Sequence, residues 1–237
     1  KTALVLSMTR NMAVNHNQPI ALFSLEMSSV QLVNRLIASE TELGSEKIRN
    51  GKLSEEEWQQ LHSKIKALIK APIYVDDTPA LSIFELRAKC RRLQQRYGIK
   101  VLIIDYLQLM SSARPIDNRV QEISDITRNL KIMAKELNVP VITLAQLARG
   151  SEKRTDHRPV LSDLRDSGSI EQDADIVLFL YRDEYYAQES GPNDESDKNS
   201  AECIVAKNRH GETKSVPLHW QGEFMRFTAQ ELVRREM

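Results

Sequence analysis

The sequence predicts an α/β fold in which helices flank a mostly parallel central sheet. Short apolar or β-branched segments alternate along the chain with longer segments whose apolar residues recur every three or four positions. Several of the short segments are almost continuously apolar, as strands buried on both faces of a parallel sheet are. With 237 residues, 41% of them hydrophobic, the chain can bury one sizeable core. We therefore expect a single domain over residues 1–237.

Strands and helices follow from these patterns in chain order. Five segments are predicted strands, at 19–26, 72–77, 101–110, 140–147 and 175–182. Ser54 with Glu57, and Ser82 with Glu85, have the spacing of capping boxes, so each pair predicts the start of a helix. A third helix is predicted over 120–137 from the spacing of its apolar side chains.

The end of the chain changes character. Residues 201–228 are predicted to form two or three antiparallel strands with a turn at His210-Gly211, which gives a C-terminal β-hairpin region. Residues 187–200 are polar and acidic and contain Gly and Pro, so a mobile surface loop is predicted there.

Charge and cysteine content narrow the class of protein. Lys plus Arg and Asp plus Glu are equal at 33 each, so a nucleic-acid partner has to be held by a local patch rather than by overall positive charge. Cys90 and Cys203 lie far apart without CxxC or Cys/His partners, which supports neither a zinc site nor a disulfide framework. No apolar run approaches the roughly 18 to 20 residues that cross a bilayer, and signal-peptide features are missing. We expect a cytoplasmic protein.

Polar residues stand at the carboxyl ends of three predicted strands, where open α/β sheets bind ligands. Asp105 ends the most apolar strand, in the position of a carboxylate that holds the Mg²⁺ of a nucleotide; the alternative is an Asp that caps the next loop. Glu26 can polarise a water for attack on a γ-phosphate, or it is an acid favoured by the start of a helix. Gln146 can sense a γ-phosphate, or it has no role.

Lys1 and Thr2 supply the matching phosphate end of a nucleotide site. A lysine reaches β- and γ-phosphate oxygens, a threonine hydroxyl joins the Mg²⁺ shell, and a helix N-terminus adds backbone donors. Lys-Thr is a common dipeptide and does not indicate a nucleotide site by itself. It supports such a site only together with the three strand-end residues. Together these five positions predict a site for ATP and Mg²⁺.

Five sequence blocks carry a resemblance that covers essentially the whole chain. FSLEMS, LIIDYLQLM, AQLAR, RPVLSDLRDSGSIEQDADIVLFLYRDEYY and AKNRHGET, in this order, resemble the C-terminal motor domain of bacterial replicative DNA helicases of the DnaB type. The resemblance implies a RecA-like P-loop NTPase fold. It implies that Lys1 and Thr2 end the Walker A loop, that Glu26 is the catalytic glutamate, that Asp105 is the Walker B aspartate and that Gln146 is the γ-phosphate sensor.

The same resemblance implies two further sets of functional residues. Lys207 and Arg209 match the basic finger that such helicases insert into the nucleotide site of the neighbouring subunit. The segment with Arg165, Asp166 and Gly168 matches a loop that faces the central channel and holds the phosphate backbone of single-stranded DNA. Asp166 stands where many relatives carry Glu.

The implied activity is that of an ATP-dependent helicase, a homohexameric ring that moves 5′ to 3′ on single-stranded DNA and unwinds duplex. Contacts to phosphate predict binding that is salt-sensitive and independent of base sequence. Primase and a helicase loader are expected partners, through or with a separate N-terminal domain. A second basic stretch lines either the channel or a subunit interface; it contains Arg149, Lys153, Arg154 and Arg158.

Two features depart from the family pattern. The Walker A glycines and the N-terminal collar domain are not in the sequence, and the segment at 111–119 is short where a longer Gly-rich channel loop is expected. Two other interpretations stay open. One is a RecA-like ATPase without helicase activity, either a recombinase-type filament or a regulatory ring, and the other is an inert ring-shaped DNA clamp. The KNR hairpin and the SDLRDSGS segment favour the helicase.

Overall fold

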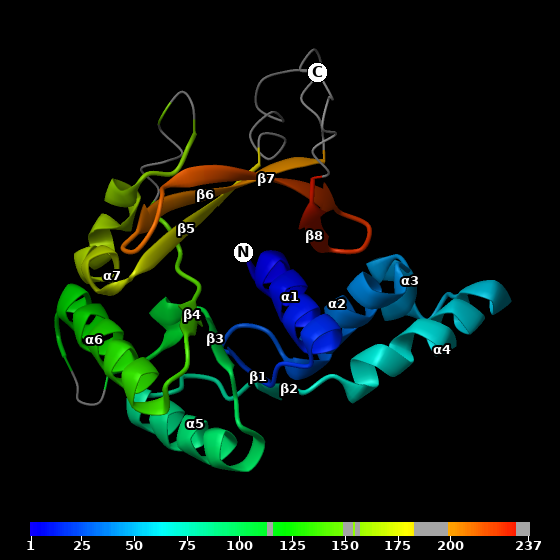
Figure 1. Cartoon of the computed structure of the whole chain (residues 1–237), viewed down its shortest axis with the longest axis horizontal. Helices are drawn as coiled ribbons and strands as arrows, with labels where there is room; N and C mark the ends of the chain where they lie inside the picture. The colour runs from blue at the N-terminus through cyan, green and yellow to red at the C-terminus, as the bar shows by residue number, and fades with distance from the viewer. Residues whose placement is uncertain (113–115, 149–153, 155–156, 183–198, 231–237) are drawn as a thin grey trace.

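The chain folds around two four-stranded sheets, one parallel and one antiparallel. A computed structural model describes residues 1–112, 116–148, 154, 157–182 and 199–230 (Figure 1). The predicted loop at 187–200 lies, apart from its last two residues, outside the described residues. None of the helices in the described part combines the length and apolar character that a membrane crossing needs.

The parallel sheet has the strand order β2-β1-β3-β4. Its strands are β1 (Ile20–Ser24), β2 (Ile73–Asp76), β3 (Val101–Asp105) and β4 (Val141–Thr143). The two central strands, β1 and β3, are buried along their whole length because both faces of the sheet are covered. Four of the five predicted strands are thereby confirmed. The third ends earlier than predicted because a 3-10 helix (Leu107–Leu109) follows it.

Helices cover both faces of this sheet. In chain order, the helices of the described part are α1 (Thr2–Arg10), continued by a π-helical turn (Asn11–Asn15), α2 (Ser29–Thr41), α3 (Ser45–Asn50), α4 (Glu55–Lys70), α5 (Ile83–Tyr97), α6 (Arg119–Leu137) and α7 (Gly168–Asp173). Helices α5 and α6 lie on one side of the sheet, and α1 and α2 lie on the other (Figure 1). Alternate side chains of β1 point to opposite faces: Phe23 packs with residues of α5 and α6, and Leu22 packs with residues of α1 and α2. The predicted helices starting after Ser54 and Ser82 are confirmed, and both capping boxes form.

The fifth predicted strand is correct in position but belongs to the other sheet. β5 (Ile176–Tyr181) pairs antiparallel with β6 (Ser200–Asn208), which continues to β7 (Lys214–Gln221) and β8 (Arg226–Ala229). The side chains of β5 alternate between exposed and buried, as in a sheet with one covered face. The predicted C-terminal antiparallel strands are confirmed.

Helix α1 packs against both sheets. Its side chains Val5 and Leu6 join the core beneath the parallel sheet. On its other side Ala3 packs with Trp220 and Phe227 of the antiparallel sheet, whose rings lie 4.5 Å apart. The hydroxyl of Ser7 also accepts the backbone N–H of Phe227 at 2.9 Å. The start of α1 is therefore fixed by contacts from two directions (Figure 1).

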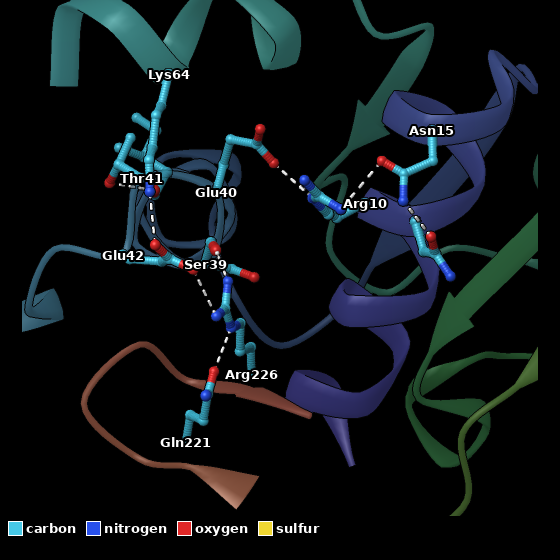
Figure 2. A network of polar contacts seen from close by, with 11 residues as sticks. Arg10, Asn15, Ser39, Glu40, Thr41, Glu42, Lys64, Gln221 and Arg226 are labelled. Atoms are coloured by element: carbon cyan, nitrogen blue, oxygen red, sulfur yellow. Dashed lines mark hydrogen bonds and ion pairs between the residues drawn. The ribbon is translucent and has the colours of Figure 1, made fainter. Parts of the chain in front are cut away.

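Arg226, at the start of β8, ties the antiparallel sheet to the C-terminal end of α2 (Figure 2). Its guanidinium donates to the carbonyl of Ser39 at 3.0 Å, to the carboxylate of Glu42 at 2.8 Å and to the side chain of Gln221. Lys64 of α4 binds the same Glu42 at 2.5 Å. Hydrogen bonds from Lys64 and Arg226 hold the pKa of the Glu42 carboxyl below its usual range. Cations here also complement the negative end of the α2 dipole.

We expect Arg226→Met to lower the free energy of unfolding by about 1–2 kcal/mol, because it removes charge-assisted hydrogen bonds and leaves the Ser39 carbonyl without this donor. Urea unfolding followed by circular dichroism measures the change. Arg49→Met is the control: Arg49 forms an exposed ion pair with Glu46 at 3.7 Å, so its loss is expected to cost less than about 0.5 kcal/mol. Equal losses for the two variants would contradict a structural role for Arg226.

Candidate functional site

The strand order of the parallel sheet marks where a ligand is expected. The chain leaves β1 for β2 on one side and continues to β3 and β4 on the other side, so the connections diverge at the carboxyl ends of β1 and β3. Ligands of open α/β sheets bind in the crevice outside such a switch point. Ser24 pairs with Asp105 at this position, and Glu26 follows two residues after β1. Two predicted site residues therefore flank the switch point.

Asp105 and Thr2 are in direct contact. The hydroxyl of Thr2 donates to Asp105 Oδ2 at 2.7 Å, and Asp105 is only 3% exposed at the end of β3. A hydroxyl and a carboxylate oxygen side by side are suitable ligands for a hard cation such as Mg²⁺, which binds through few protein oxygens and takes the rest from phosphates and water. The backbone N–H groups of the first turn of α1, which begins at Thr2, favour an anion at the same place.

The side chain of Lys1 contacts the segments that follow β3 and β4. Its ammonium donates to the carbonyl of Ala145, after β4, at 3.2 Å and lies 5.4 Å from the ring centroid of Tyr106. Although Lys1 is exposed as a residue, desolvation of the ammonium lowers its pKa, and the negative charges of Asp105 and Glu26 act in the opposite direction. The Lys1 ammonium thus lies close enough to Asp105 and Glu26 for their negative charges to act on it, and a phosphate bound here would add a further negative charge.

Glu26 stands on a tight turn between β1 and α2. The Ser24 hydroxyl donates to the Met27 carbonyl at 2.7 Å, and the Leu25 N–H donates to the Asp105 carbonyl at 2.8 Å. The Glu26 carboxylate itself is exposed and forms no hydrogen bond or ion pair with the described residues. This arrangement fixes the backbone and leaves the carboxylate available to a water or a substrate group.

Gln146 is held through its backbone by a residue that the sequence did not single out. The side-chain amide of Gln108 donates to the Gln146 carbonyl at 3.1 Å and accepts its N–H at 3.2 Å. Gln108 is in turn bound at its own carbonyl by Arg119. The Gln146 side chain stays exposed next to Ala145, the partner of Lys1. The signal for Gln108 is a polar residue three positions after Asp105 in the otherwise apolar LQLM run.

The structure thus brings five predicted residues to one edge of the sheet: Lys1, Thr2, Glu26, Asp105 and Gln146. Lys207 and Arg209 lie elsewhere. Lys207 donates to the carbonyls of Glu171 and Ala174, at 2.6 and 2.8 Å, and Arg209 donates to the carbonyl of Gln172 at 3.1 Å. Both cations therefore sit at the C-terminal end of α7, where they also complement the helix dipole.

The predicted DNA-contacting segment is helical rather than an open loop. Arg165 and Asp166 lie in a 3-10 helix (Leu161–Ser167), and Gly168 begins α7. The 3-10 helix is connected to the strand-end segment by a backbone hydrogen bond from Ala148 N–H to the Asp163 carbonyl, at 3.1 Å. The prediction of a loop at this position was wrong in its local geometry.

The second basic stretch is partly neutralised within the chain. Arg154 binds the buried carboxylate of Asp163 at 2.5 and 2.9 Å, and this bond holds the pKa of Asp163 below its usual range. Arg158 binds Glu202 at 2.7 Å and lies over the ring of Tyr181. These two arginines fasten the segment to its surroundings. The other two members of the stretch, Arg149 and Lys153, lie outside the described residues.

The sequence can be placed among known proteins. Residues 1–229 match the family described as DnaB-like helicase C terminal domain. The chain is 48% identical over 232 residues to the replicative DNA helicase DnaB of Geobacillus stearothermophilus, and equally so to the replicative DNA helicase DnaC of Bacillus subtilis. Each alignment covers 98% of this chain and 50% of the relative, so the chain spans about half the length of these curated relatives.

Solved structures agree with this placement. A structure described as an ATPase domain superposes with a TM-score of 0.90 at 39% identity, over 98% of this chain and 81% of that one. A DnaB-like replicative helicase, described with its interactions with primase, superposes with a TM-score of 0.89 at 38% identity, over 97% of this chain and 56% of that one. The predicted RecA-like α/β fold is confirmed at this level. The chain belongs to the family of DnaB-like helicase C terminal domains.

Proposed function

We propose that this chain is the motor part of a replicative DNA helicase that hydrolyses ATP and moves 5′ to 3′ along single-stranded DNA as a homohexameric ring. The observation that carries the proposal is the 2.7 Å contact between Thr2 and Asp105 at the switch point of the sheet, with Lys1 and Glu26 beside it. This is an oxygen pair with a lysine and an exposed carboxylate, the set of groups that phosphoryl transfer requires.

The five clustered residues fit ATP together with Mg²⁺. Lys1 would bind β- and γ-phosphate oxygens, while Thr2 and Asp105 would hold Mg²⁺, either directly or through water. When bound, Mg²⁺ would neutralise part of the negative charge on the β- and γ-phosphates. Glu26 would orient the attacking water, since its carboxylate is exposed beside Lys1, and Gln146 would contact the γ-phosphate or that water.

Lys207 and Arg209 are proposed to act in the site of the neighbouring subunit. Their contacts are with α7, and within the described part of the chain no hydrogen bond or ion pair connects either one to the five clustered residues. A guanidinium that stabilises charge on the γ-phosphate from an adjacent subunit would make turnover depend on assembly of the ring.

Single-stranded DNA is the proposed track. Arg165, Asp166 and Gly168 would hold its phosphate backbone by one basic side chain and main-chain N–H groups, repeated around a ring. The bond from Ala148 to Asp163 supports this assignment, because it connects the segment to a residue two positions along the chain from the proposed γ-phosphate sensor. Primase and a loader are proposed partners of the whole protein, through or with an N-terminal domain, and the cytoplasm is its proposed location.

We expect Glu26→Gln to lower ATP turnover at least about 100-fold, because the amide cannot act as the base that orients water. Nucleotide affinity should change little, since Lys1, Thr2 and Asp105 remain. Steady-state turnover and binding of a fluorescent ATP analogue, in the full-length protein, measure the two effects. Glu56→Gln, at an exposed site on α4, is the matched control. Turnover within threefold of wild type would rule out the assignment of Glu26.

Arg209→Ala is expected to lower turnover at least about 100-fold by removing the finger from the neighbouring site. Mixing it one to one with Glu26→Gln tests whether the finger acts between subunits. A site made of Glu26 from one variant and Arg209 from the other is intact, so about a quarter of the sites should recover in randomly mixed rings. If the mixture stays as inactive as either variant, Arg209 does not act in trans. Lys214→Ala, at the exposed start of β7, is the control.

Arg165→Ala is expected to weaken binding to homopolymeric single strands equally for different bases. Each lost phosphate contact should reduce the slope of log affinity against log salt by about 0.7. Fluorescence anisotropy with oligo-dT and oligo-dA over a salt series measures both quantities. Arg92→Ala, at an exposed position of α5, is expected to leave the slope unchanged.

Unwinding of a forked duplex separates the helicase from a RecA-like ATPase that assembles without unwinding. DNA-stimulated turnover accompanied by strand separation is the expected result. Stimulated turnover with the fork intact would favour the recombinase-type or regulatory alternative.

A further inference from the structure

Arg209, the proposed finger, is held by three contacts with the chain just before β5. Its backbone N–H donates to the carbonyl of Asp175 at 2.9 Å, and its Nη2 donates to the carbonyl of Gln172 at 3.1 Å. Its Nη1 lies 3.4 Å from Asp175 Oδ1. The end of α7 and the residues after it therefore fix the positions of both the backbone and the guanidinium of Arg209.

Asp175 is itself fixed by Lys131 of α6. The Lys131 ammonium lies 2.5 Å from Asp175 Oδ1 and donates to the carbonyl of Asp173 at 3.0 Å. One turn earlier on α6, the hydroxyl of Thr127 donates to the Asp173 carboxylate at 2.5 Å. Helix α6 is anchored in the core by Ile126 and Leu130, so these bonds connect the finger to a rigid part of the domain.

The Asp175 carboxylate faces two cations, Lys131 and Arg209. The hydrogen bond from Lys131 holds the pKa of the Asp175 carboxyl below its usual range, and the charges of Arg209 and His210 act in the same direction. The carboxylate is therefore ionised at neutral pH and attracts both cations. The hydrogen bonds and ion pairs that Lys131 and Asp175 form with described residues all lie outside the five residues of the proposed nucleotide site.

The arrangement leaves the guanidinium able to bind a second anion. A guanidinium has five N–H donors in a planar fork, and its contacts with the described residues engage only the two terminal nitrogens. The Arg209 side chain is also 48% exposed. Donors on the open side are thus available to a phosphate while Asp175 keeps its position.

We propose that Asp175, held in place by Lys131, is a positioning residue that aims the Arg209 guanidinium at the nucleotide of the neighbouring subunit. The inference rests on the proposed trans-acting role of Arg209. A long, flexible arginine loses conformational freedom when it engages a phosphate, and a side chain already held in direction loses less. The contribution of Asp175 should therefore appear in the catalytic step. It should not appear in the binding of ATP, because the other subunit provides the groups that bind ATP.

Asp175→Asn in the full-length protein tests this directly, because the amide keeps the shape and removes the charge. We expect kcat for ATP to fall about fivefold, the upper end for an exposed ion pair, with KM within twofold of wild type. Lys131→Met should lower kcat in the same way, and Lys131→Arg should restore it. Lys135→Met, one turn further along α6 and exposed, is the matched control. An unchanged kcat in both Asp175→Asn and Lys131→Met would overturn the proposal.

A double-variant cycle separates positioning from a general structural defect. In the Arg209→Ala background, Asp175→Asn should cause no further loss of kcat, because no guanidinium remains to be aimed. A further fivefold loss there would show that Asp175 acts by another route and would overturn the proposal. If Arg209→Ala itself retained full turnover, the proposed trans finger would fail. If only the Asp175 and Lys131 variants retained it, the positioning role alone would fail.

Discussion

The contact between the Thr2 hydroxyl and the Asp105 carboxylate is the interaction on which the arrangement of the site depends. A carboxylate at the end of a fully buried strand is costly unless it has partners, and here the partner comes from the first residue of α1. This bond places the start of a helix directly opposite the switch point of the parallel sheet. Lys1, the Glu26 turn and the segment after β4 then converge on the same position, since all four strands end at one edge.

The antiparallel sheet is packed onto the elements that form the site. It packs on α1 through Trp220 and Phe227, and Arg226 fastens it to the end of α2. The same sheet carries Lys207 and Arg209 at the far end of β6, where they bind the carbonyls that close α7. The groups proposed for one nucleotide site and those proposed for the next are thus parts of one packed unit.

The sequence was sufficient to predict an element where the interactions that form it join residues close together in the chain. Capping boxes after Ser54 and Ser82 involve residues three apart, and buried central strands reveal themselves by their apolar runs. The sequence was insufficient to predict the pairing of a strand or the role of a side chain whose partner lies far away in the chain. The apolar run at 175–182 is compatible with either sheet, and only its pairing with β6 decides between them. Gln108 acquires a role from a peptide 38 positions away, and Asp175, which lies between α7 and β5, acquires one from Lys131 of α6. The strand-end residues were predictable because topology, rather than specific pairing, brings them together.

The bond between the Ala148 N–H and the Asp163 carbonyl connects two parts of the candidate site without any side chain. It joins the segment after Gln146 to the 3-10 helix that contains Arg165, and it is made entirely by the main chain. Such a bond does not depend on which side chains occupy the two positions, so the connection tolerates substitution at both. Proline is the exception at position 148, because it has no N–H to donate. A physical link between the segment after β4 and the 3-10 helix can therefore persist through sequence change while leaving almost no mark in the sequence itself.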